Sequence, residues 1–280
     1  MKVETLLKSS SLRLKNFMID SSILDSELLL AKTLKISREK LLINLEKKLS
    51  KTELNEFNKL IEQRINKKPI AYIRGFKEFW KSNFAVNQNV LVPRPETELI
   101  VEEAINILKN QKSYKILDIG TGSGCILLSI LKDNPLCIGH GIDVSFKAIK
   151  IANLNANLQH LNNRARFIKS DIDNYYTNNY DLIVSNPPYI NKYKLSNLKE
   201  DIKKFEPNVA LDGGPCGYKI IKKVILKSSS LIKKKGILIL EIDNNQVENT
   251  KKILKKYGFF LKKTKKDLND CFRCLISEKI

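Results

Sequence analysis

The chain has 280 residues, of which 42% are hydrophobic and 29% charged, and its formal net charge is +20. This length predicts one large or two modest domains with a sizeable core. The longest strongly apolar runs, at residues 126–131 and 237–240, are far too short to span a bilayer, so no membrane partner is expected. The first residues mix charged and apolar side chains and lack the continuous apolar segment of a secretory signal, which favours a cytoplasmic protein.

The positive charge and the cysteines restrict the function only weakly. An excess of lysine favours acidic partners such as nucleic acid, but the lysines are spread along the chain without a stripe of interleaved aromatic residues. Direct nucleic-acid binding therefore stays open without being required. The five cysteines suggest no disulfide framework, and a zinc site at Cys271 and Cys274 would need distant ligands, so we predict reduced thiols and no metal.

The first 75 residues predict a small bundle of helices. Apolar residues recur at steps of three or four in two stripes, one ending at Leu34 and one running from Leu54 to Ile65. Ser50 or Thr52 can cap the second helix, and Pro69 is expected to end it. A domain boundary is expected just beyond.

The next segment predicts a β-hairpin that leads into a helix. Buried-type residues before and after residues 87–89, a turn-prone stretch, indicate two short strands around that turn. Pro95 and the acids at Glu96 and Glu98 suit the first turn of a helix, which we expect to extend to about Asn110.

From Tyr114 onward, short β-rich runs alternate with helical stretches, which predicts an α/β fold with a parallel sheet flanked by helices. The predicted strands lie at residues 115–120, 137–143, 165–171, 181–189 and 236–241. Two further β-rich runs, at residues 259–263 and 271–277, are candidates for a closing antiparallel pair.

Three glycines lie where the first of these strands ends and a helix begins. Gly120, Gly122 and Gly124 form a G-x-G-x-G cluster, in which the backbone can turn tightly and approach a ligand without Cβ interference. The cluster favours a nucleotide-like ligand, although a purely structural tight turn would use the same residues.

Acidic residues follow the next two strands. Asp143 ends the second strand, where a carboxylate can accept both ribose hydroxyls of an adenosine group, or can cap the helix that starts at Ser145. Asp171 ends the third strand and can reach the adenine edge, although Asp173 lies nearby and acids are common at strand ends.

The fourth strand ends in Asn186-Pro187-Pro188-Tyr189, at the sheet edge where ligands of open parallel sheets bind. The prolines hold a rigid loop, so the Asn186 side-chain oxygen and the Pro187 carbonyl can both accept hydrogen bonds from a ligand NH₂ group. Tyr189 can then cover the flat face of the ligand. The alternative is a proline-rich turn with Tyr189 packed in the core.

With these motifs the sequence resembles the class I S-adenosylmethionine-dependent methyltransferases that carry N-P-P-Y, and specifically the release factor glutamine methyltransferases of the HemK/PrmC family. The resemblance covers nearly the whole chain and includes residues 75–80, 92–98, 205–207, 210–211, 240–241 and Gln246. N-P-P-Y alone is also similar to adenine and guanine amino methyltransferases. The P-R-P-E-T-E and F-E-P segments therefore discriminate between the substrates.

The resemblance implies methylation of the glutamine side-chain amide in the Gly-Gly-Gln motif of peptide chain release factors, which supports translation termination. It implies a release-factor-binding helical domain at residues 1–75, a hairpin linker at 76–95 and a Rossmann-like catalytic domain at 96–280, in a protein that we expect to be a monomer. The implied cofactor-binding residues are Gly120, Thr121, Gly122, Ser123, Gly124, Asp143, Asp171, Ile172 and Asn186. The implied substrate-binding residues are Asn186, Pro187, Pro188 and Tyr189, with Asn186, Pro187 and Tyr189 as the catalytic group.

Two departures from the family pattern affect the details of the adenine pocket. Asp243 stands where the family often has glycine, and Ile172 stands where some members carry an aromatic residue. Two other functions stay open: an amino methyltransferase acting on adenine or guanine in RNA or DNA, and a binding module without catalysis. No general base can be assigned from the sequence.

Overall fold

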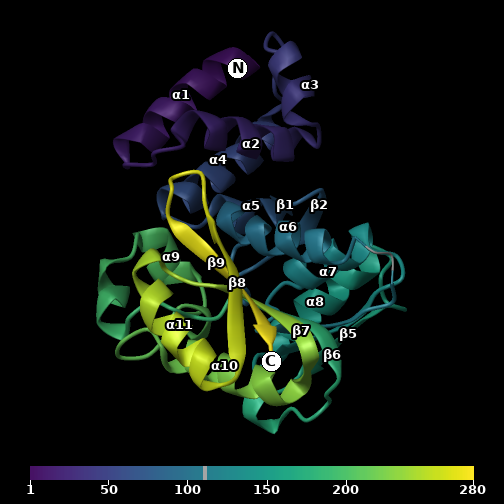
Figure 1. The fold of residues 1–280 in the computed structure, drawn as a ribbon. Coiled ribbons are helices and arrows are strands. Elements are labelled where there is room, and N and C mark those ends of the chain that lie inside the picture. Colours follow the sequence, from purple (N-terminus) through teal and green to yellow (C-terminus); the bar gives the residue numbers. More distant parts are fainter. Residues whose placement is uncertain (110–111) are drawn as a thin grey trace. The chain divides into compact units, whose positions relative to one another are not determined.

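The computed structural model of the chain describes residues 1–109 and 112–280 (Figure 1). The chain divides into two compact units. The first unit comprises Met1–Phe76 together with Lys199–Phe205, and the second comprises Lys77–Leu198 and Glu206–Ile280. In the described residues, every helix is too short or too polar to cross a membrane.

The first unit is a bundle of helices, as the apolar stripes predict. Its helices are α1 (Val3–Asn16), α2 (Ser22–Leu34), α3 (Arg38–Ile43), α4 (Lys51–Ile65), α5 (Ile70–Arg74) and α9 (Glu200–Phe205). Leu29, Leu30, Phe57 and Ile61 are among the apolar side chains that fill its core. A buried ion pair joins two of its helices, with 2.6 Å between Arg64 Nε and Asp25 Oδ2.

Helix α4 begins as expected but ends early. The Ser50 hydroxyl accepts from the Glu53 backbone and the Glu53 carboxylate accepts from the Ser50 backbone, which forms a capping box. The expectation that Pro69 ends this helix was wrong, because the chain leaves the helix at Ile65 and turns at Lys67 with φ of +66°. Pro69 instead lies directly before α5.

The second unit contains a seven-stranded sheet with the order β5-β4-β3-β6-β7-β9-β8. Its strands are β3 (Lys115–Ile119), β4 (Ile138–Asp143), β5 (Ala165–Lys169), β6 (Tyr180–Ser185), β7 (Ile232–Glu241), β8 (Phe259–Lys266) and β9 (Phe272–Lys279). The five strands from β5 to β7 are parallel, and β9 pairs antiparallel with both β7 and β8. The prediction of a parallel sheet that ends in an antiparallel pair is confirmed.

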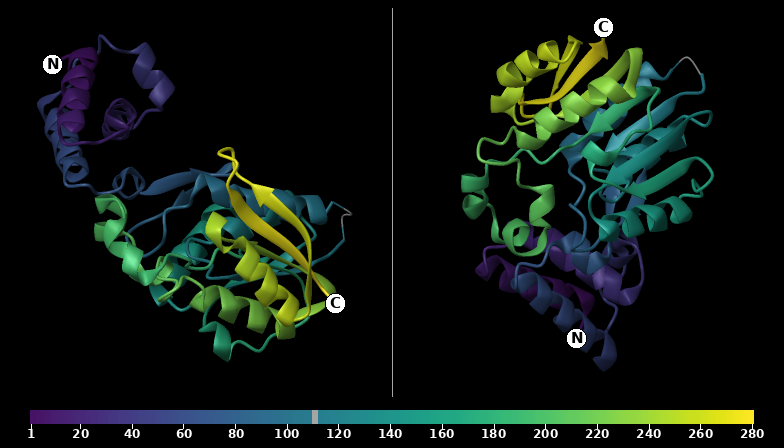
Figure 2. Two further views of the ribbon diagram at one scale, coloured as in Figure 1. Left: turned by 60° about the vertical axis from the view of Figure 1, so that its left-hand side comes forward. Right: turned by 90° about the horizontal axis from the view of Figure 1, so that it is seen from below.

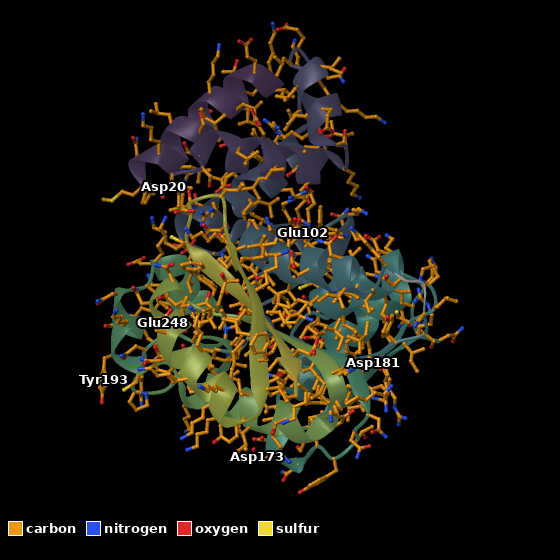
Figure 3. All side chains as sticks on the ribbon, viewed as in Figure 1. Asp20, Glu102, Asp173, Asp181, Tyr193 and Glu248 are labelled. Atoms are coloured by element: carbon orange, nitrogen blue, oxygen red, sulfur yellow. The ribbon has the colours of Figure 1, made fainter. Side chains whose placement is uncertain are left out.

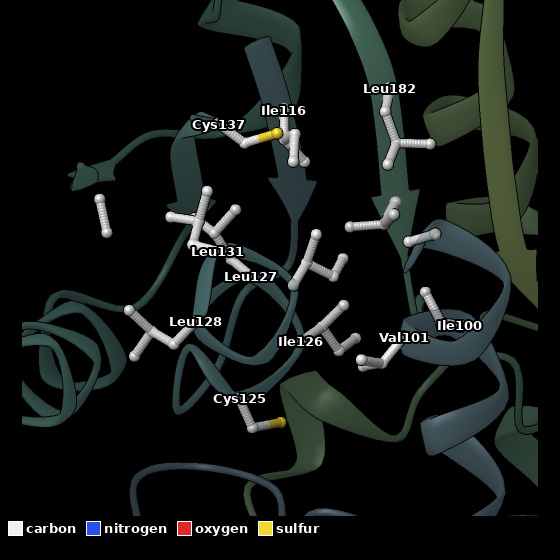
Figure 4. Close-up of a cluster of buried hydrophobic side chains, with 14 of the residues drawn as sticks. Ile100, Val101, Ile116, Cys125, Ile126, Leu127, Leu128, Leu131, Cys137 and Leu182 are labelled. Atoms are coloured by element: carbon white, nitrogen blue, oxygen red, sulfur yellow. The ribbon is translucent and has the colours of Figure 1, made fainter. Parts of the chain in front are cut away.

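Helices cover both faces of this sheet (Figure 2). They are α6 (Glu98–Ile107), α7 (Cys125–Asp133), α8 (Phe146–Leu158), α10 (Lys219–Leu231) and α11 (Val247–Lys256), with short 3-10 turns at η1 (Pro95–Thr97), η2 (Ile172–Asn174), η3 (Lys192–Asn197), η4 (Asn208–Ala210) and η5 (Asn244–Gln246). Ile116 and Leu182 pack on the side of α6, α7 and α8, as Figure 4 shows for part of that cluster. Their strand neighbours Leu117 and Ile183 pack on the side of α10 and α11. Successive residues of these strands therefore face opposite sides of the sheet, and both sides are apolar, as buried parallel strands require.

The predicted hairpin is present, but its turn lies earlier than expected. Its strands are β1 (Phe76–Phe79) and β2 (Ser82–Ala85), so the turn falls at Trp80, which has φ of +53°. Residues 87–89 do form a turn, closed by the Asn87 side chain, but they connect no strands. Val86, Val90 and Val92 are buried but belong to no strand. The alternation of valines in this segment therefore indicates burial and not strand pairing.

Helix α6 begins after Pro95 as predicted and ends at Ile107. The expected limit at Asn110 lies outside the described residues.

Candidate active site

A cavity of about 500 Å³ lies within the second unit, where the sheet and the loops after its strands meet. The ends of β3 and β4, the turn after β5 and the loop after β6 contribute to its wall, as does α10. Two further segments complete it: Asn89, Val90 and Leu91, and Pro207, Val209 and Ala210. The parallel register brings the carboxyl ends of the strands together at one edge of the sheet, which is where ligands bind in open α/β folds.

The glycine turn presents bare backbone to this cavity. Gly120 and Gly122 line it with φ of +74° and +55°, and a Cβ at either position would meet nothing within 4 Å. Gly124 has a different role, since a Cβ there would lie 3.0 Å from the Phe167 ring. Two glycines are therefore open to a ligand, and the third permits close packing of the helix on the sheet.

The two residues between these glycines, Thr121 and Ser123, do not line the cavity. Thr121 is buried and donates to Asp118 Oδ2 at 2.6 Å. Ser123 is also buried, and its carbonyl accepts from the Asn155 side chain at 2.8 Å. Neither is among the residues that line the cavity, so these two positions support the turn from behind.

Asp118 lies beneath the turn, at the end of β3. Its side chain is fully buried, and burial raises the pKa of its carboxyl to about 7. Its Oδ1 has no hydrogen-bond partner among the described residues. This residue was given no role in the sequence analysis.

Asp143 lines the cavity and holds two backbone groups. Its Oδ2 accepts from the Gly122 N–H at 3.0 Å, and its Oδ1 accepts from the Ser145 N–H at 2.8 Å. The Ser145 hydroxyl provides the side-chain cap of α8, accepting from the Ala148 N–H. Burial raises the pKa of Asp143. The carboxylate therefore ties the glycine turn to the end of β4.

Asp171 and Ile172 both line the cavity, and a lysine on α10 engages the acid. Lys223 Nζ lies 2.6 Å from Asp171 Oδ1 and 2.8 Å from Asp173 Oδ2. The Lys223 ammonium lowers the pKa of Asp171. Asp173, labelled in Figure 3, keeps 57% of its side chain exposed and does not line the cavity. Lys223 could not be predicted from the sequence, because a lysine on the polar face of an amphipathic helix is ordinarily solvated.

Only two of the four residues of the N-P-P-Y loop line the cavity. Asn186 and Pro188 line the cavity, whereas Pro187 and Tyr189 are not among its lining residues. The Tyr189 hydroxyl instead donates to Glu241 Oε1 at 3.4 Å, and the ring packs beside the apolar cluster under α10 and α11. Burial raises the pKa of this hydroxyl.

A hydrogen bond to a buried threonine holds the side-chain amide of Asn186. Its Nδ2 donates to the hydroxyl oxygen of Thr97, 3.1 Å away, and Thr97 is buried. In a planar amide the oxygen points away from the nitrogen, so this bond turns Oδ1 toward the opposite side. Thr97 belongs to the P-R-P-E-T-E segment, which therefore reaches the loop directly.

A second support holds the loop at Tyr189. Gln246 Nε2 donates to the carbonyls of Tyr189 and Gly217, each at 3.1 Å. Its Oε1 accepts from the Asp243 backbone at 3.1 Å, and Asp243 caps the short turn that carries Gln246. Asp243, which departs from the family pattern, thus takes part in holding this glutamine.

The two discriminating segments also contact each other. Arg94 Nη2 lies 2.6 Å from Glu206 Oε1, and the Glu206 side chain is almost completely buried. The Val92 N–H donates to the other oxygen of Glu206 at 3.4 Å. This ion pair joins the segment before α6 to the segment that carries Pro207, Val209 and Ala210 in the cavity wall.

Comparisons with known proteins agree with this arrangement. The chain matches the family models described as PrmC N-terminal domain, over residues 5–75, and methyltransferase small domain, over residues 97–214. It is 36% identical to the release factor glutamine methyltransferase of Buchnera aphidicola subsp. Baizongia pistaciae, over 100% of both chains. It is 34% identical to that of Caulobacter vibrioides, over 95% of this chain and 93% of the relative. The chain belongs to the release factor glutamine methyltransferase family.

A solved structure supports the fold of this member of the release factor glutamine methyltransferase family. A methyltransferase from Pyrococcus furiosus matches with a TM-score of 0.54 at 20% identity, covering 78% of this chain and 96% of the other. The similarity extends to the fold alone. The Rossmann-like methyltransferase fold expected from the sequence is thereby confirmed.

Within this family member, the sequence-predicted site residues fall into two groups. Gly120, Gly122, Asp143, Asp171, Ile172, Asn186 and Pro188 line one cavity, whereas Thr121, Ser123, Gly124, Pro187 and Tyr189 are not among its lining residues. The residues that sequence reasoning gave no role are the supports, chiefly Thr97, Glu241 and Lys223. Thr97 and Glu241 could have been found from the sequence, because both belong to segments that carry the resemblance to the family.

Proposed function

We propose that this protein transfers a methyl group from S-adenosylmethionine to the side-chain amide nitrogen of a glutamine in a peptide chain release factor. The observation that carries the proposal is the Asn186 amide, which lines the cavity and is held by Thr97 through its NH₂ group. Its oxygen is then available to accept from a planar nitrogen group. Relatives named for this reaction support glutamine rather than a nucleobase as the acceptor.

The residues around the cavity fit S-adenosylmethionine. Gly120 and Gly122 leave open space where side chains would stand, and Asp143 offers a carboxylate for ribose hydroxyls. Ile172 gives an apolar wall, and Asp171 offers a second carboxylate held by Lys223. We assign these residues to cofactor binding, with Thr121, Ser123 and Gly124 supporting the turn. When bound, the cofactor supplies an electrophilic methyl group on a sulfonium.

The chain's own residues then position the nucleophile. An amide nitrogen is a poor nucleophile because its lone pair is delocalised into the carbonyl, so orientation must supply much of the rate, in favourable cases about 7–11 kcal/mol. We assign Asn186 Oδ1, which lines the cavity, to accept one of the two amide hydrogens. We assign the carbonyl of Pro187, the next residue of the loop but not one of the lining residues, to accept the other. Two acceptors favour the positive charge that develops on nitrogen. The cavity wall includes neither histidine nor cysteine among the described residues, so no side chain of those two types in the wall can take up the proton that the nitrogen loses.

We assign release-factor binding to the helical domain at residues 1–75, followed by the hairpin linker at 76–95 and the catalytic domain at 96–280. Exposed apolar side chains at the connection between α1 and α2 support a binding role for the first domain. Phe17 is 50% exposed, Met18 is 85% exposed and Ile23 is 67% exposed. A protein partner would cover such side chains.

The proposal is tested with purified protein, methyl-labelled S-adenosylmethionine and a recombinant release factor, read by peptide mass spectrometry. We expect label on a single glutamine of the factor. Asn186→Ala should lower turnover by about 10- to 100-fold, with a smaller change in the dissociation constant of the cofactor. Asn249→Ala, on the surface of α11, is the matched control and should leave turnover unchanged.

Two results would contradict the proposal. Label on RNA or DNA, with none on the release factor, would favour an amino methyltransferase acting on nucleobases. Failure to bind the cofactor in calorimetry would favour a binding module without catalysis.

A further inference from the structure

Three polar ring side chains meet where the turn after β5 ends. They are His140 on β4, Tyr175 directly after η2, and Tyr180, the first residue of β6. His140 Nδ1 lies 2.6 Å from the Tyr180 hydroxyl oxygen and 3.1 Å from that of Tyr175, and the two hydroxyl oxygens lie 2.5 Å apart. Both tyrosines are buried. None of the three residues lines the cavity, and the proposed mechanism uses none of them.

This cluster is connected to the cavity wall through the turn that carries Asp171 and Ile172. The Tyr175 N–H donates to the Ile172 carbonyl at 3.2 Å and so closes the turn. Among residues 171–179, all of which the structure describes, only Ile172 and Tyr175 are buried, and both pack in the apolar cluster under α10 and α11. Tyr175 therefore holds the end of a turn whose other buried residue, Ile172, lines the cavity.

The start of the turn has other contacts. The Ser170 N–H donates to the Asp143 carbonyl at 2.9 Å, and Lys223 pairs with Asp171, whose side chain is 43% exposed. An ion pair with that exposure holds a turn only weakly. Beyond Tyr175, residues 176–179 are exposed and form neither helix nor strand. The Tyr175 hydroxyl therefore supplies the buried polar contact that fixes the segment after η2.

The hydrogen bonds of the cluster run in one direction when His140 is neutral. Burial and the charges of Lys115 and Arg166 lower the pKa of His140, which favours the neutral ring. We assign Nδ1 as the acceptor of the Tyr180 hydroxyl, the nearer of the two, so the Tyr175 hydroxyl donates to the Tyr180 oxygen. Loss of the Tyr175 hydroxyl then removes the contact of the turn and leaves the bond from Tyr180 to His140 intact.

We propose that Tyr175 is a positioning residue whose hydroxyl, bonded in the cluster with Tyr180 and His140, fixes the turn that carries Asp171 and Ile172 in the position that binds the cofactor. The inference rests on the proposed function, which assigns those two residues to cofactor binding. Without this bond the turn occupies several positions in the free protein. The apparent affinity for the cofactor then falls by the fraction of molecules in the binding position. Methyl transfer depends on the N-P-P-Y loop and is unchanged once the cofactor is bound.

The test compares three variants with the wild type by calorimetry with S-adenosylmethionine. Tyr175→Phe keeps the ring and removes the hydroxyl. Tyr176→Phe is the matched control, because this adjacent tyrosine is 77% exposed. Phe259→Leu controls for a loss of stability without a change at the turn. Phe259 is buried in the same apolar cluster, but it lies on β8, at the opposite edge of the sheet from β5.

We expect Tyr175→Phe to raise the dissociation constant of S-adenosylmethionine by about three- to tenfold, the effect of one buried hydrogen bond. Tyr176→Phe and Phe259→Leu should leave this constant unchanged. For methylation of the release factor at saturating cofactor, kcat and the KM for the factor should stay within about twofold of the wild type in Tyr175→Phe. A dissociation constant equal to that of the wild type, an equal increase in Phe259→Leu, or a loss of kcat at saturating cofactor would overturn the inference.

A second measurement needs neither cofactor nor methylation. In the free protein, the amide hydrogens of Asn174 and Tyr175 donate to the carbonyls of Asp171 and Ile172. We expect them to exchange with solvent about three- to tenfold faster in Tyr175→Phe than in the wild type, and at the wild-type rate in Tyr176→Phe. Equal exchange in Tyr175→Phe and the wild type would overturn the inference. Absence of release-factor methylation by the wild type would contradict the proposed function alone, since the exchange rates still report on the turn.

Discussion

Substituting Gly217 by alanine should disturb the N-P-P-Y loop from a residue that never touches the cavity. Gly217 has φ of +77°, and a Cβ added there would lie 2.5 Å from the Tyr189 carbonyl oxygen and 2.8 Å from Gln246 Nε2. Both atoms belong to the hydrogen bonds that hold the loop. The new methyl group can fit only if the loop or the glutamine moves.

The size of the effect follows from two separate costs. A left-handed backbone costs alanine about 1–2 kcal/mol relative to glycine, and overpacking a filled site costs about 1–3 kcal/mol. We therefore expect Gly217→Ala to lower the free energy of unfolding by about 2–5 kcal/mol. Because the displaced atom belongs to Tyr189, kcat for methylation should also fall by about tenfold or more.

Gly258→Ala is the control that isolates the second cost. Gly258 has φ of +74°, and the atom nearest to an added Cβ is Lys279 Nζ at 2.6 Å, the far end of a flexible side chain that can move away. Urea unfolding of both variants should therefore differ by the overpacking cost, about 1–3 kcal/mol, and only Gly217→Ala should lose activity. If both variants lost equal stability and kept wild-type kcat, the packing of Gly217 against Tyr189 would not hold the loop.

Two further predictions concern buried carboxyl groups. Because burial raises the pKa of Asp118 from 3.8 to about 7, the native state binds its proton more tightly than the unfolded state does. Its stabilising contribution, up to about 4 kcal/mol, is present below about pH 4 and is lost as the pH rises toward 7, so Asp118→Asn should flatten the dependence of the unfolding free energy on pH. Urea unfolding at several pH values checks this, and an unchanged slope would contradict it. Arg94→Met removes the ion pair that Arg94 makes with the buried Glu206, and it should lower the unfolding free energy by about 1–3 kcal/mol after allowance for the partial exposure of Arg94. Lys199→Met, which breaks the exposed ion pair with Asp20, should have no measurable effect. Equal effects in the two variants would contradict that account.

Local sequence patterns were sufficient to predict residues that line the cavity. The glycines at positions 120 and 122 and the acid at 143 follow consecutive strands, and parallel strands bring their carboxyl ends to one edge. The cavity could therefore be predicted without knowledge of long-range contacts. The hairpin turn could not, because the alternation of Val86, Val90 and Val92 indicates burial and does not say which segments pair.

The residues that support the site could not be predicted from local sequence patterns, because each of them contacts a residue far away in the chain. Nothing in the sequence around Thr97 shows that it bonds to Asn186, and nothing around Glu241 shows that it bonds to Tyr189. Likewise, the periodicity of α10 predicts a polar surface at Lys223 and not an ion pair with Asp171. A motif thus predicts the residue that faces the ligand better than the residue that orients it, since orientation depends on the packing of the whole unit.

Selection of the substrate must arise outside the N-P-P-Y loop. In the mechanism proposed above, the acceptors of the loop would accept hydrogen bonds from an amide and from the amino group of a nucleobase equally well. The remaining wall of the cavity includes Val90 and Leu91, before the P-R-P-E-T-E segment, and Val209, after F-E-P. Arg94 and Glu206 tie these two parts of the wall together. The segments that distinguish this family by sequence therefore shape the space beside the loop, where a glutamine side chain and a planar base would differ in fit.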